Sequence, residues 1–440
     1  MKRIFLLVLT LSLLLLCACD GSTVPVYDSP SVMPPPTEEV HASETLPLKI
    51  AVDDSSFISD LSEVTTKGKD DTILRLMRQF YVGADGLWAN PETLSIYDRQ
   101  RDCFTSGCQK KNCPHVDENC GAWLGDSNGL YFAVKDSTAY VASGTPDNFG
   151  SLLDLKFFTL DLTTGEEQIY YEIPGAEGQS VHLGDVLVCG NTVVMSYDIA
   201  HHIYDYEGRS DYKMHHILAI DLLSGELTRV MEREVYFGDN YDLWGMNEER
   251  LILAFHAGGM IQSYGAYIGS YLSSQSAYGY DEYIRDQHRW VLLEYPIEEN
   301  AKWSKHIIAN DSANSLNLYS YSNFYEGTLY YVSNDCVMSY DLDSRKMQKL
   351  FSQPGICHMS CFDGKIFYET TDGKYFWYDL SNSDIYQYPE DPSTRPFFIV
   401  EESDDGFFGS KTPTRNDFCH IDKEDFYQGN YEEALPLYWG

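Results

Sequence analysis

One phrase recurs four times along this chain of 440 residues and constrains its fold more than any other feature. In each copy, β-branched and aromatic residues lead into Asp-Leu, a few polar residues follow, and a second strand-like run returns. This pattern predicts a β-hairpin, because polar residues close its turn. A further pair of strand-like runs precedes each copy, so every unit is predicted to hold four strands. The copies are residues 157–171, 217–231, 337–351 and 375–389.

Three less regular copies extend the series to seven units, the first at residues 80–103 and the last at 397–427. Four-stranded units that recur about every 40 to 50 residues are typical of a β-propeller. We therefore predict an all-β chain in which residues 49–440 form one β-propeller, with seven four-stranded blades and a range of six to eight. A pair of β-sandwiches is the alternative, although it has no reason to reuse one turn phrase. Helix is expected only as a turn at residues 70–80.

The N-terminus is typical of an export signal. Lys2 and Arg3 precede an apolar run at residues 4–16, which is too short to span a membrane comfortably. Residues 16–19, Leu-Cys-Ala-Cys, resemble the lipobox of bacterial lipoproteins, which implies a signal peptide at residues 1–18 and a lipid on Cys19. Residues 19–48 are rich in Pro and Ser and are predicted to be a flexible tether. An ordinary cleaved signal with incidental cysteines is the alternative.

The net charge of the chain makes some classes of binding partner unfavourable. Removal of residues 1–18 leaves 29 basic and 67 acidic side chains, a balance of −38. Nucleic acid is a poor partner for such a surface, and so is a bare anionic membrane. The lipid is therefore the expected link to the membrane, with the folded body on its extracytoplasmic face.

Residues 103–120 hold four cysteines and one histidine within one connection. Cys108, Cys113, His115 and Cys120 form a donor set suited to a structural Zn²⁺, with Cys103 as a fifth candidate. A pair of disulfides is the rival interpretation for an exported chain, and inert thiols are a third. Besides the lipidated Cys19, nine cysteines remain in the mature chain, and this odd number favours metal or reduced thiols.

The lipobox, the tether, the repeats and the motif Cys-x4-Cys-x-His-x4-Cys followed by Gly-Ala-Trp together resemble the TolB-like propeller lipoproteins of clostridia-type Gram-positive bacteria. The resemblance covers the chain from about residue 75 to its end. It implies a propeller and a membrane anchor, and it implies no established activity.

A near-palindrome at residues 200–217 carries two pairs of histidines. If residues 207–210 form a turn, His202 faces His215 and His201 faces His216. Cross-strand imidazoles lie close enough to share a metal ion. This predicts a weak metal site, with an exposed hairpin tip as the alternative.

Two other segments allow binding roles but are explained more simply. Residues 265–283 are rich in Tyr, Ser and Gly, a composition that suits recognition surfaces and also a long inter-strand loop. The cysteines at 357, 361 and 419 are interpreted as isolated thiols.

Recognisable catalytic motifs are missing from the sequence. Residues 125–129 fit Gly-x-Ser-x-Gly, but a strand-like run follows them where a nucleophile elbow needs a helix. No catalytic residue is assigned, and we favour a membrane-anchored binding module for a glycan, a peptide or a protein. The alternative is an exported hydrolase or lyase that acts on polysaccharide or cell-wall material through residues gathered from several blades.

Overall fold

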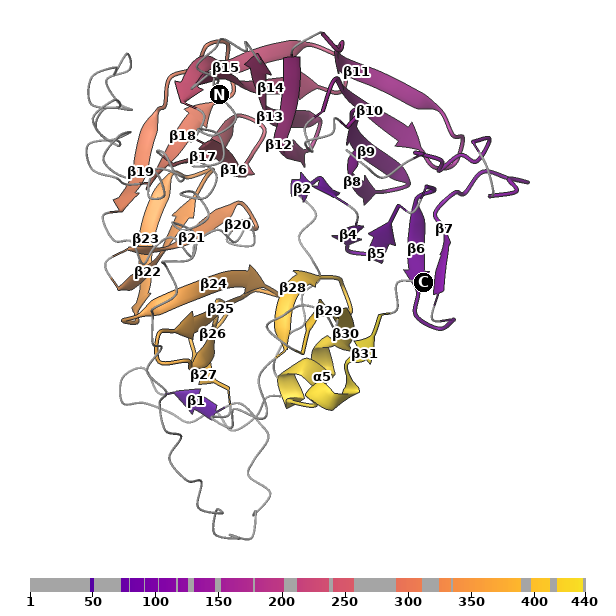
Figure 1. The fold of residues 1–440 in the computed structure, drawn as a ribbon. Helices are drawn as coiled ribbons and strands as arrows, with labels where there is room; N and C mark the ends of the chain where they lie inside the picture. The colour runs from indigo at the N-terminus through magenta and orange to yellow at the C-terminus, as the bar shows by residue number, and fades with distance from the viewer. Residues whose placement is uncertain are drawn as a thin grey trace, which may run out of the picture. The chain divides into compact units, whose positions relative to one another are not determined.

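The computed structural model of the chain is built from seven antiparallel sheets (Figure 1). The described residues belong to one compact unit, Glu44–Gly440. The structure describes residues 48–50, 73–78, 80–90, 92–101, 103–115, 118–125, 130–146, 152–176, 179–201, 212–236, 240–256, 290–310, 324–333, 335–388, 397–411 and 418–437.

The seven sheets follow one another along the chain as the blades of a β-propeller, which confirms the predicted fold and the predicted number of blades. Each blade contributes four strands in chain order. Blade 1 consists of β4 (Phe80–Gly83), β5 (Gly86–Ala89), β6 (Ser95–Asp98) and β7 (Cys103–Ser106). Blade 2 consists of β8 (Leu130–Lys135), β9 (Thr138–Ser143), β10 (Leu155–Asp161) and β11 (Glu167–Ile173). Blade 3 consists of β12 (Gln179–Cys189), β13 (Thr192–His201), β14 (Tyr212–Asp221) and β15 (Leu227–Tyr236).

The later blades follow the same plan. Blade 4 consists of β16 (Asn240–Met246), β17 (Arg250–His256), β18 (Trp290–Pro296) and β19 (Lys305–Asn310), and blade 5 of β20 (Phe324–Tyr325), β21 (Thr328–Ser333), β22 (Cys336–Asp341) and β23 (Lys346–Ser352). Blade 6 consists of β24 (Ile356–Phe362), β25 (Lys365–Thr370), β26 (Tyr375–Asp379) and β27 (Ile385–Gln387). Blade 7 consists of β28 (Phe398–Glu402), β29 (Gly406–Ser410), β30 (Phe418–Asp422) and β31 (Leu435–Pro436).

The repeated Asp-Leu phrase has a structural explanation in the hairpin between the third and fourth strands. The Asp161 carboxylate accepts hydrogen bonds from the backbone N–H groups of Thr163 (2.7 Å) and Thr164 (3.1 Å). Leu162 then donates its N–H to the Ser137 carbonyl, 2.9 Å away in the turn between the first and second strands of the same blade. The aspartate therefore shapes one turn and the leucine joins it to the other. Asp221-Leu222 repeats all of these bonds; Asp341 and Asp379 each accept from one backbone N–H, and Leu342 and Leu380 donate to the neighbouring turn as Leu162 does.

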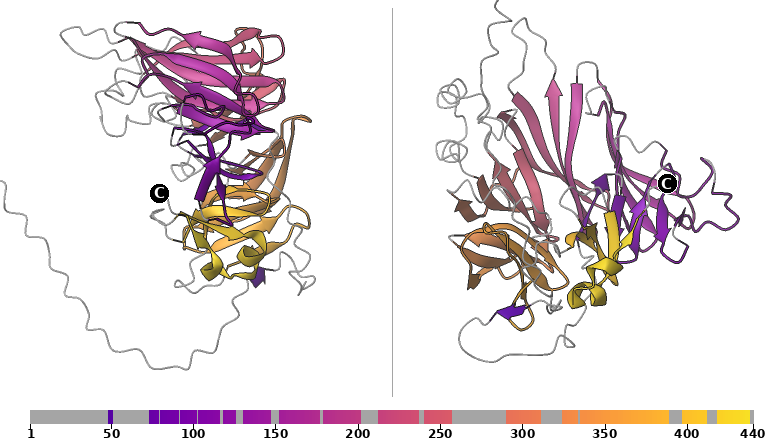
Figure 2. Two further views of the ribbon diagram at one scale, coloured as in Figure 1. Left: turned by 90° about the vertical axis from the view of Figure 1, so that its right-hand side faces the viewer. Right: turned by 60° about the horizontal axis from the view of Figure 1, so that its bottom comes forward.

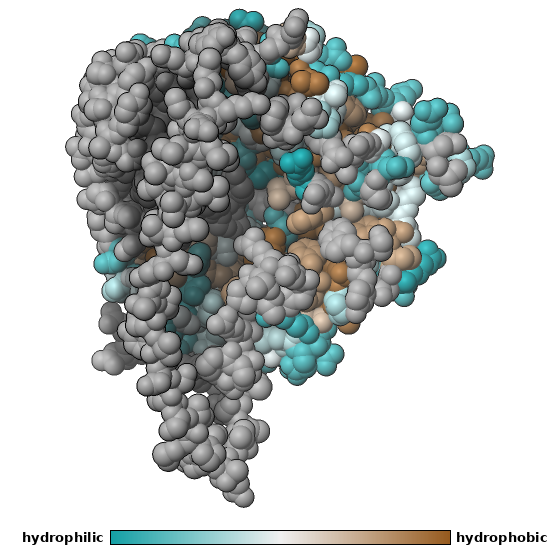
Figure 3. Space-filling model, in the orientation of Figure 1, coloured by the Kyte–Doolittle hydropathy of each residue, from teal (hydrophilic) through white to brown (hydrophobic). Residues whose placement is uncertain are grey.

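Apolar side chains fill the space between successive sheets. Phe132 and Phe157 belong to a cluster that spans blades 1 to 3, whereas Trp377 and Phe407 join blade 6 to blade 7. Among the described residues visible in Figure 3, hydrophilic ones gather along the outer edge and hydrophobic ones lie farther in. Both faces of a blade are therefore covered by its neighbours, as propeller packing requires.

The N-terminal segments add strands to blades far along the chain. Strand β1 (Leu48–Ile50) pairs with β27, and β2 (Ile73–Arg75) and β3 (Met77–Arg78) pair with β12 and β8, the first strands of blades 3 and 2 (Figure 1). The predicted helical turn at residues 70–80 is therefore wrong. Leu74 and Leu76 are buried while Ile73 and Arg75 are half-buried, a period of two that fits a strand and not a helix.

Helix is scarce in the described part of the chain. Helix α5 (Lys423–Gln428) follows β30 and ends at Gly429, which has a left-handed φ of 76°, and a 3₁₀ turn covers Tyr431–Glu433. Figure 2 shows α5 beside the strands of blade 7. None of the described helices combines the length and the apolar character needed to cross a membrane.

The last blade meets the first through polar and apolar contacts. Arg99, between β6 and β7, forms ion pairs with Asp405 and with Asp422 of blade 7, the latter at 3.0 Å. Beside them, His420 is 2% exposed, and burial together with the Arg99 charge lowers its pKa to about 4. Val82 and Leu87 of blade 1 pack in one cluster with Phe408 of blade 7.

Acid is expected to weaken this junction through His420. Its native pKa of about 4 lies below the ordinary value of 6.5, so the unfolded chain binds a proton that the native chain does not. Stability is therefore lost as the pH falls from 6.5 towards 4, by up to about 3 kcal/mol from this group. Denaturant titrations across this range, in buffer free of metal ions, should show a flatter pH profile for His420→Gln than for the wild type. The exposed His358 supplies the control, since His358→Gln should keep the wild-type slope; parallel profiles for all three proteins would contradict the prediction.

Candidate metal centre and ligand groove

The cysteine and histidine cluster lies in the connection between β7 and β8, and backbone bonds hold this connection on blade 1. Gly107 donates its N–H to the Leu94 carbonyl, and Leu94 donates its own to the Ala122 carbonyl, both at 2.8 Å. Residues before and after the cluster are thus held at one point. This arrangement closes the connection into a compact loop.

Four of the predicted donors meet in this loop. The ligand atoms of Cys108, Cys113, His115 and Cys120 all lie within 4.8 Å of one another. Cys120 Sγ is 3.7 Å from His115 Nδ1. Sulfur ligands of a tetrahedral Zn²⁺ at bonds of about 2.3 Å are about 3.8 Å apart. The donor set and its spacing therefore fit zinc, with four protein ligands and none left for a substrate.

Backbone N–H groups point at the sulfur atoms, as in the surroundings of many thiolate sites. Ala122 donates its N–H to Cys120 Sγ at 3.5 Å. Burial alone would raise the pKa of Cys113, but N–H donation from His115 and Gly121 lowers it. Burial and the neighbouring thiols raise the pKa of Cys120 to about 11. A bound cation would displace that proton and balance the clustered sulfur charge.

The cluster also contacts blade 2. Gln109 donates its N–H to the Leu162 carbonyl at 2.8 Å, in the Asp-Leu turn of that blade. Gly121 lies against Gly165 so closely that a Cβ atom on Gly165 would be 2.9 Å from the Gly121 Cα. A metal in this loop would therefore fasten the short first blade to the second.

The remaining cysteines lie apart from this group. Cys103 is exposed on β7, outside the set of four donors. All nine cysteines of the described residues are free thiols in the structure. Cys361 and Cys419 are buried, which agrees with their interpretation as isolated thiols, whereas Cys357 is half-buried beside His358 and Glu369 and is not isolated.

The histidine hairpin pairs in a different register from the predicted one. His215 faces Asp198 and His216 faces Tyr197 across β13 and β14, a shift of four residues; the same pairing continues to the other end of the two strands, where Thr192 faces Asp221 beside the Asp-Leu turn. His202 lies outside the described residues, as does the side chain of His201. Residues 265–283, 126–129 and 1–47 also lie outside them.

His215 belongs to a buried polar cluster near the junction with blade 4. Its Nδ1 lies 2.6 Å from Asp198, whose other oxygen is 2.7 Å from Lys213 Nζ. Burial opposes the Asp198 charge, but the His215 hydrogen bond and Lys213 hold its pKa below the usual range. Burial and nearby Asp185 raise the pKa of Asp242 to about 6. His215 Nε2 has no hydrogen-bond partner among the described residues.

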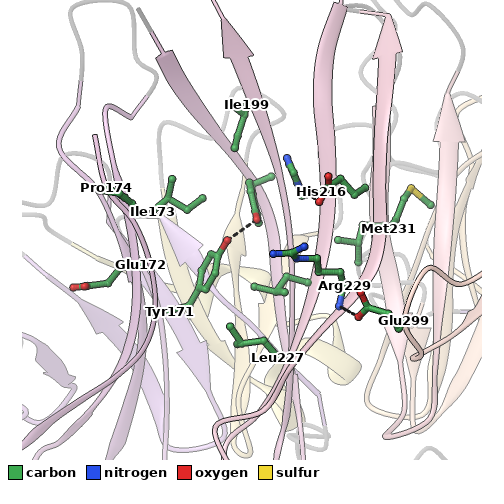
Figure 4. A pocket seen from close by; sticks show the side chains of 14 residues that line it. Tyr171, Glu172, Ile173, Pro174, Ile199, His216, Leu227, Arg229, Met231 and Glu299 are labelled. Atoms are coloured by element: carbon green, nitrogen blue, oxygen red, sulfur yellow. Dashed lines mark hydrogen bonds and ion pairs between the residues drawn. The ribbon is translucent and has the colours of Figure 1, made fainter. Parts of the chain in front are cut away.

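His216 points to the other face of β14, into a groove of about 480 Å³ between blades 2 and 3 (Figure 4). Its ring stacks on Tyr197 with centroids 4.8 Å apart, and the Tyr197 hydroxyl is 2.7 Å from that of Tyr171. Figure 4 shows Arg229 reaching towards Tyr171. Its backbone N–H donates to Glu299 at 2.8 Å.

Sequence reasoning missed this groove, apart from His216. Its walls come from β11, β13, β14 and β15 and from one residue of blade 4, so no local motif marks it. The only local signal was the palindrome that singled out His216.

Comparisons with known proteins give only distant structural matches. No protein-family model matches the sequence, and no curated protein matches it. Among solved structures, the chain is similar to BamB from Moraxella catarrhalis (12% identity over 80% of this chain and 87% of that one, TM-score 0.36). It is also similar to oligogalacturonate lyase from Vibrio parahaemolyticus (10% identity over 78% of this chain and 89% of that one, TM-score 0.38). A third similar structure is the tricorn protease, at 11% sequence identity and a TM-score of 0.32. The match covers 72% of this chain but only 30% of the tricorn protease. These neighbours are β-propeller proteins.

The purified chain is expected to retain one zinc ion after dialysis, detected by elemental analysis. Cys113→Ser should lose it, because three donors hold zinc far more weakly than four. At free zinc a thousandfold above Kd, the linked stabilisation is about 4 kcal/mol, so the unfolding free energy should fall by about that amount. Cys103→Ser is the matched control and should keep both metal and stability. A metal-free wild type with four fewer titratable thiols would instead establish disulfides.

Proposed function

We propose that this protein is a TolB-like propeller lipoprotein that serves as a binding module on the extracytoplasmic face of a cell membrane. The lipid on Cys19 would hold it there, and residues 19–48 would set the propeller off the surface. Its ligand is a glycan, a peptide or a protein segment. The observation that carries this proposal is the aromatic groove between blades 2 and 3.

The size and lining of the groove suit a small or extended ligand. Its volume of about 480 Å³ lies within the range of ordinary ligand sites. The half-buried Tyr171 and His216 offer rings and polar atoms at one wall, and the buried Tyr197 supports both: its ring stacks on His216 and its hydroxyl lies 2.7 Å from that of Tyr171. Such amphipathic rings bind sugar rings or peptide side chains with little loss of conformational entropy.

Arg229 lines the groove together with three carboxylates, Glu172, Glu232 and Glu299, so an acidic group on the ligand would have to bind at Arg229 itself. Arg229 is exposed, and no ion pair of its guanidinium is found among the described residues. Burial lowers the pKa of His216 although nearby Glu232 opposes the shift, so this imidazole is neutral at pH 7. On a strongly acidic protein, Arg229 is thus the natural partner of a carboxylate, as in an acidic sugar or a peptide.

One observation favours catalysis as a second candidate. His215 is oriented by Asp198 through Nδ1, which leaves its buried Nε2 unpaired within the described part of the chain. A histidine oriented by a carboxylate is the arrangement of a general base. A hydrolase or lyase acting on polysaccharide or cell-wall material would use it for proton transfer. His215 is only 4% exposed, however, so we rank binding first.

Arrays of glycans and peptides, probed with the purified chain, test the binding proposal. We expect the chain to bind array ligands that carry a carboxylate. Arg229→Ala should lower its affinity for these ligands at least tenfold, because a charge-assisted hydrogen bond contributes about 1.5–3 kcal/mol. Tyr171→Ala should weaken neutral and acidic ligands alike.

Arg101→Ala, at an arginine of blade 1 whose side chain is 73% exposed, supplies the matched control and should bind like the wild type. Equal binding by the Arg229 and Arg101 variants would reject the groove. Cleavage of array ligands by the wild type, and none by His215→Ala, would put the catalytic candidate first.

Membrane attachment is tested separately by Cys19→Ala. We expect the wild type to stay in the membrane fraction after a high-salt wash and to partition into detergent, because two acyl chains anchor a protein stably. The variant should lose the lipid, which mass spectrometry of the N-terminal peptide would show. An unlipidated Cys19 in the wild type would contradict the proposal.

A further inference from the structure

A β-bulge in blade 6 brings two successive side chains together. Strand β24 pairs with β25 so that Ile356 faces Thr370 and His358 faces Glu369, with Cys357 as the extra residue between them. Neighbours on a regular strand point to opposite faces. A bulge breaks this alternation and redirects a side chain. Cys357 and His358 are therefore able to approach the same partner.

That partner is Glu369. One ligand atom each from Cys357, His358 and Glu369 lies within 4.8 Å of the other two. Cys357 Sγ also donates to the Glu369 carbonyl oxygen at 3.5 Å. His358 is exposed, whereas Cys357 and Glu369 are half-buried, so the group can be reached from solvent.

The backbone on one side of the bulge is held in place. Thr371 donates its N–H to the Gly355 carbonyl at 2.7 Å, and Gly355 has a left-handed φ of 73°. The Thr370 hydroxyl binds Asp372 at 2.6 Å. Asp372 also lies near enough to add negative potential at Cys357. The three donors thus project from paired strands in a field that attracts cations.

Thiolate, imidazole and carboxylate are together the donors of a zinc-class divalent ion. Three protein ligands with an exposed side are the pattern of zinc sites that keep a position for water, whereas structural sites use four. We propose that Cys357, His358 and Glu369 form a second metal site, for an exchangeable Zn²⁺-class ion with at least one coordination position open to solvent. This site is independent of the groove between blades 2 and 3 and of the centre formed by Cys108, Cys113, His115 and Cys120.

Cobalt reports on the two sites separately, because thiolate ligands give intense absorption with Co²⁺. Under anaerobic conditions and after chelator treatment, the purified chain should bind two equivalents of Co²⁺. Cys357→Ser should remove the absorption of the weaker equivalent, and His358→Ala should weaken that equivalent at least tenfold. Cys113→Ser should abolish the tighter equivalent and leave the weaker one. Added azide should shift the weaker equivalent's spectrum alone, since only that ion has an open position.

Cys336→Ser supplies the control, because Cys336 is a half-buried thiol outside either donor group and should leave both equivalents unchanged. His358 is exposed, so its replacement tests the site even if Cys357→Ser folds poorly. A single equivalent in the wild type overturns the proposal. So does a second equivalent that keeps its affinity in His358→Ala and its absorption in Cys357→Ser. If azide leaves the absorption spectrum of the second Co²⁺ equivalent unchanged, the proposed open coordination position is rejected.

Discussion

Each blade of this propeller is stable only because another blade covers each of its apolar faces. A single four-stranded sheet with two buried faces cannot stay in water, so the ring has to close on itself. Here closure uses the cluster around Val82, Leu87 and Phe408 and the ion pairs of Arg99 with blade 7. The N-terminal strands complete other blades instead: β1 joins blade 6, and β2 and β3 join blades 3 and 2. The closing contact is therefore a contact of side chains and turns, with no strand shared between the first and last blades among the described residues.

Buried charge in this structure lies where blades meet. Lys423 of α5 contacts Asp363 of blade 6 at 3.1 Å and Glu402 of blade 7 at 2.6 Å, and Lys365 pairs with Asp363. Such networks seldom add much net stability, but an unpaired partner costs several kcal/mol. They therefore disfavour any packing in which the two blades slip against each other. The candidate metal centre likewise lies between two blades, beside blade 1, whose strands β4 to β7 have four residues each.

Sequence reasoning predicted the fold well because its main signal is local. The aspartate of each Asp-Leu phrase shapes one turn, and the leucine hydrogen-bonds to a second turn of the same blade. The residues that fix the shape of a blade therefore lie within one repeat unit of the sequence. The errors lie where partners are distant. Residues 73–78 were predicted to lie in a helical turn, whereas their pairing with β12 and β8 makes them strands. The register of β13 with β14 is kept along the whole pair, from Thr192 opposite Asp221 to Ile199 opposite Met214, and does not follow the symmetry of the histidines.

The sequence by itself determined the all-β class, the seven repeated units and the donor set Cys108, Cys113, His115 and Cys120, because turn residues and closely spaced ligands act over short stretches. Only the tertiary structure decided that Cys103 stands outside that set, that Tyr171 and Arg229 share a groove, and that a bulge turns Cys357 and His358 towards Glu369. These juxtapositions depend on strand register and on the packing of one blade against the next. Both are settled by burial of apolar surface across the whole ring, which no short stretch of sequence records.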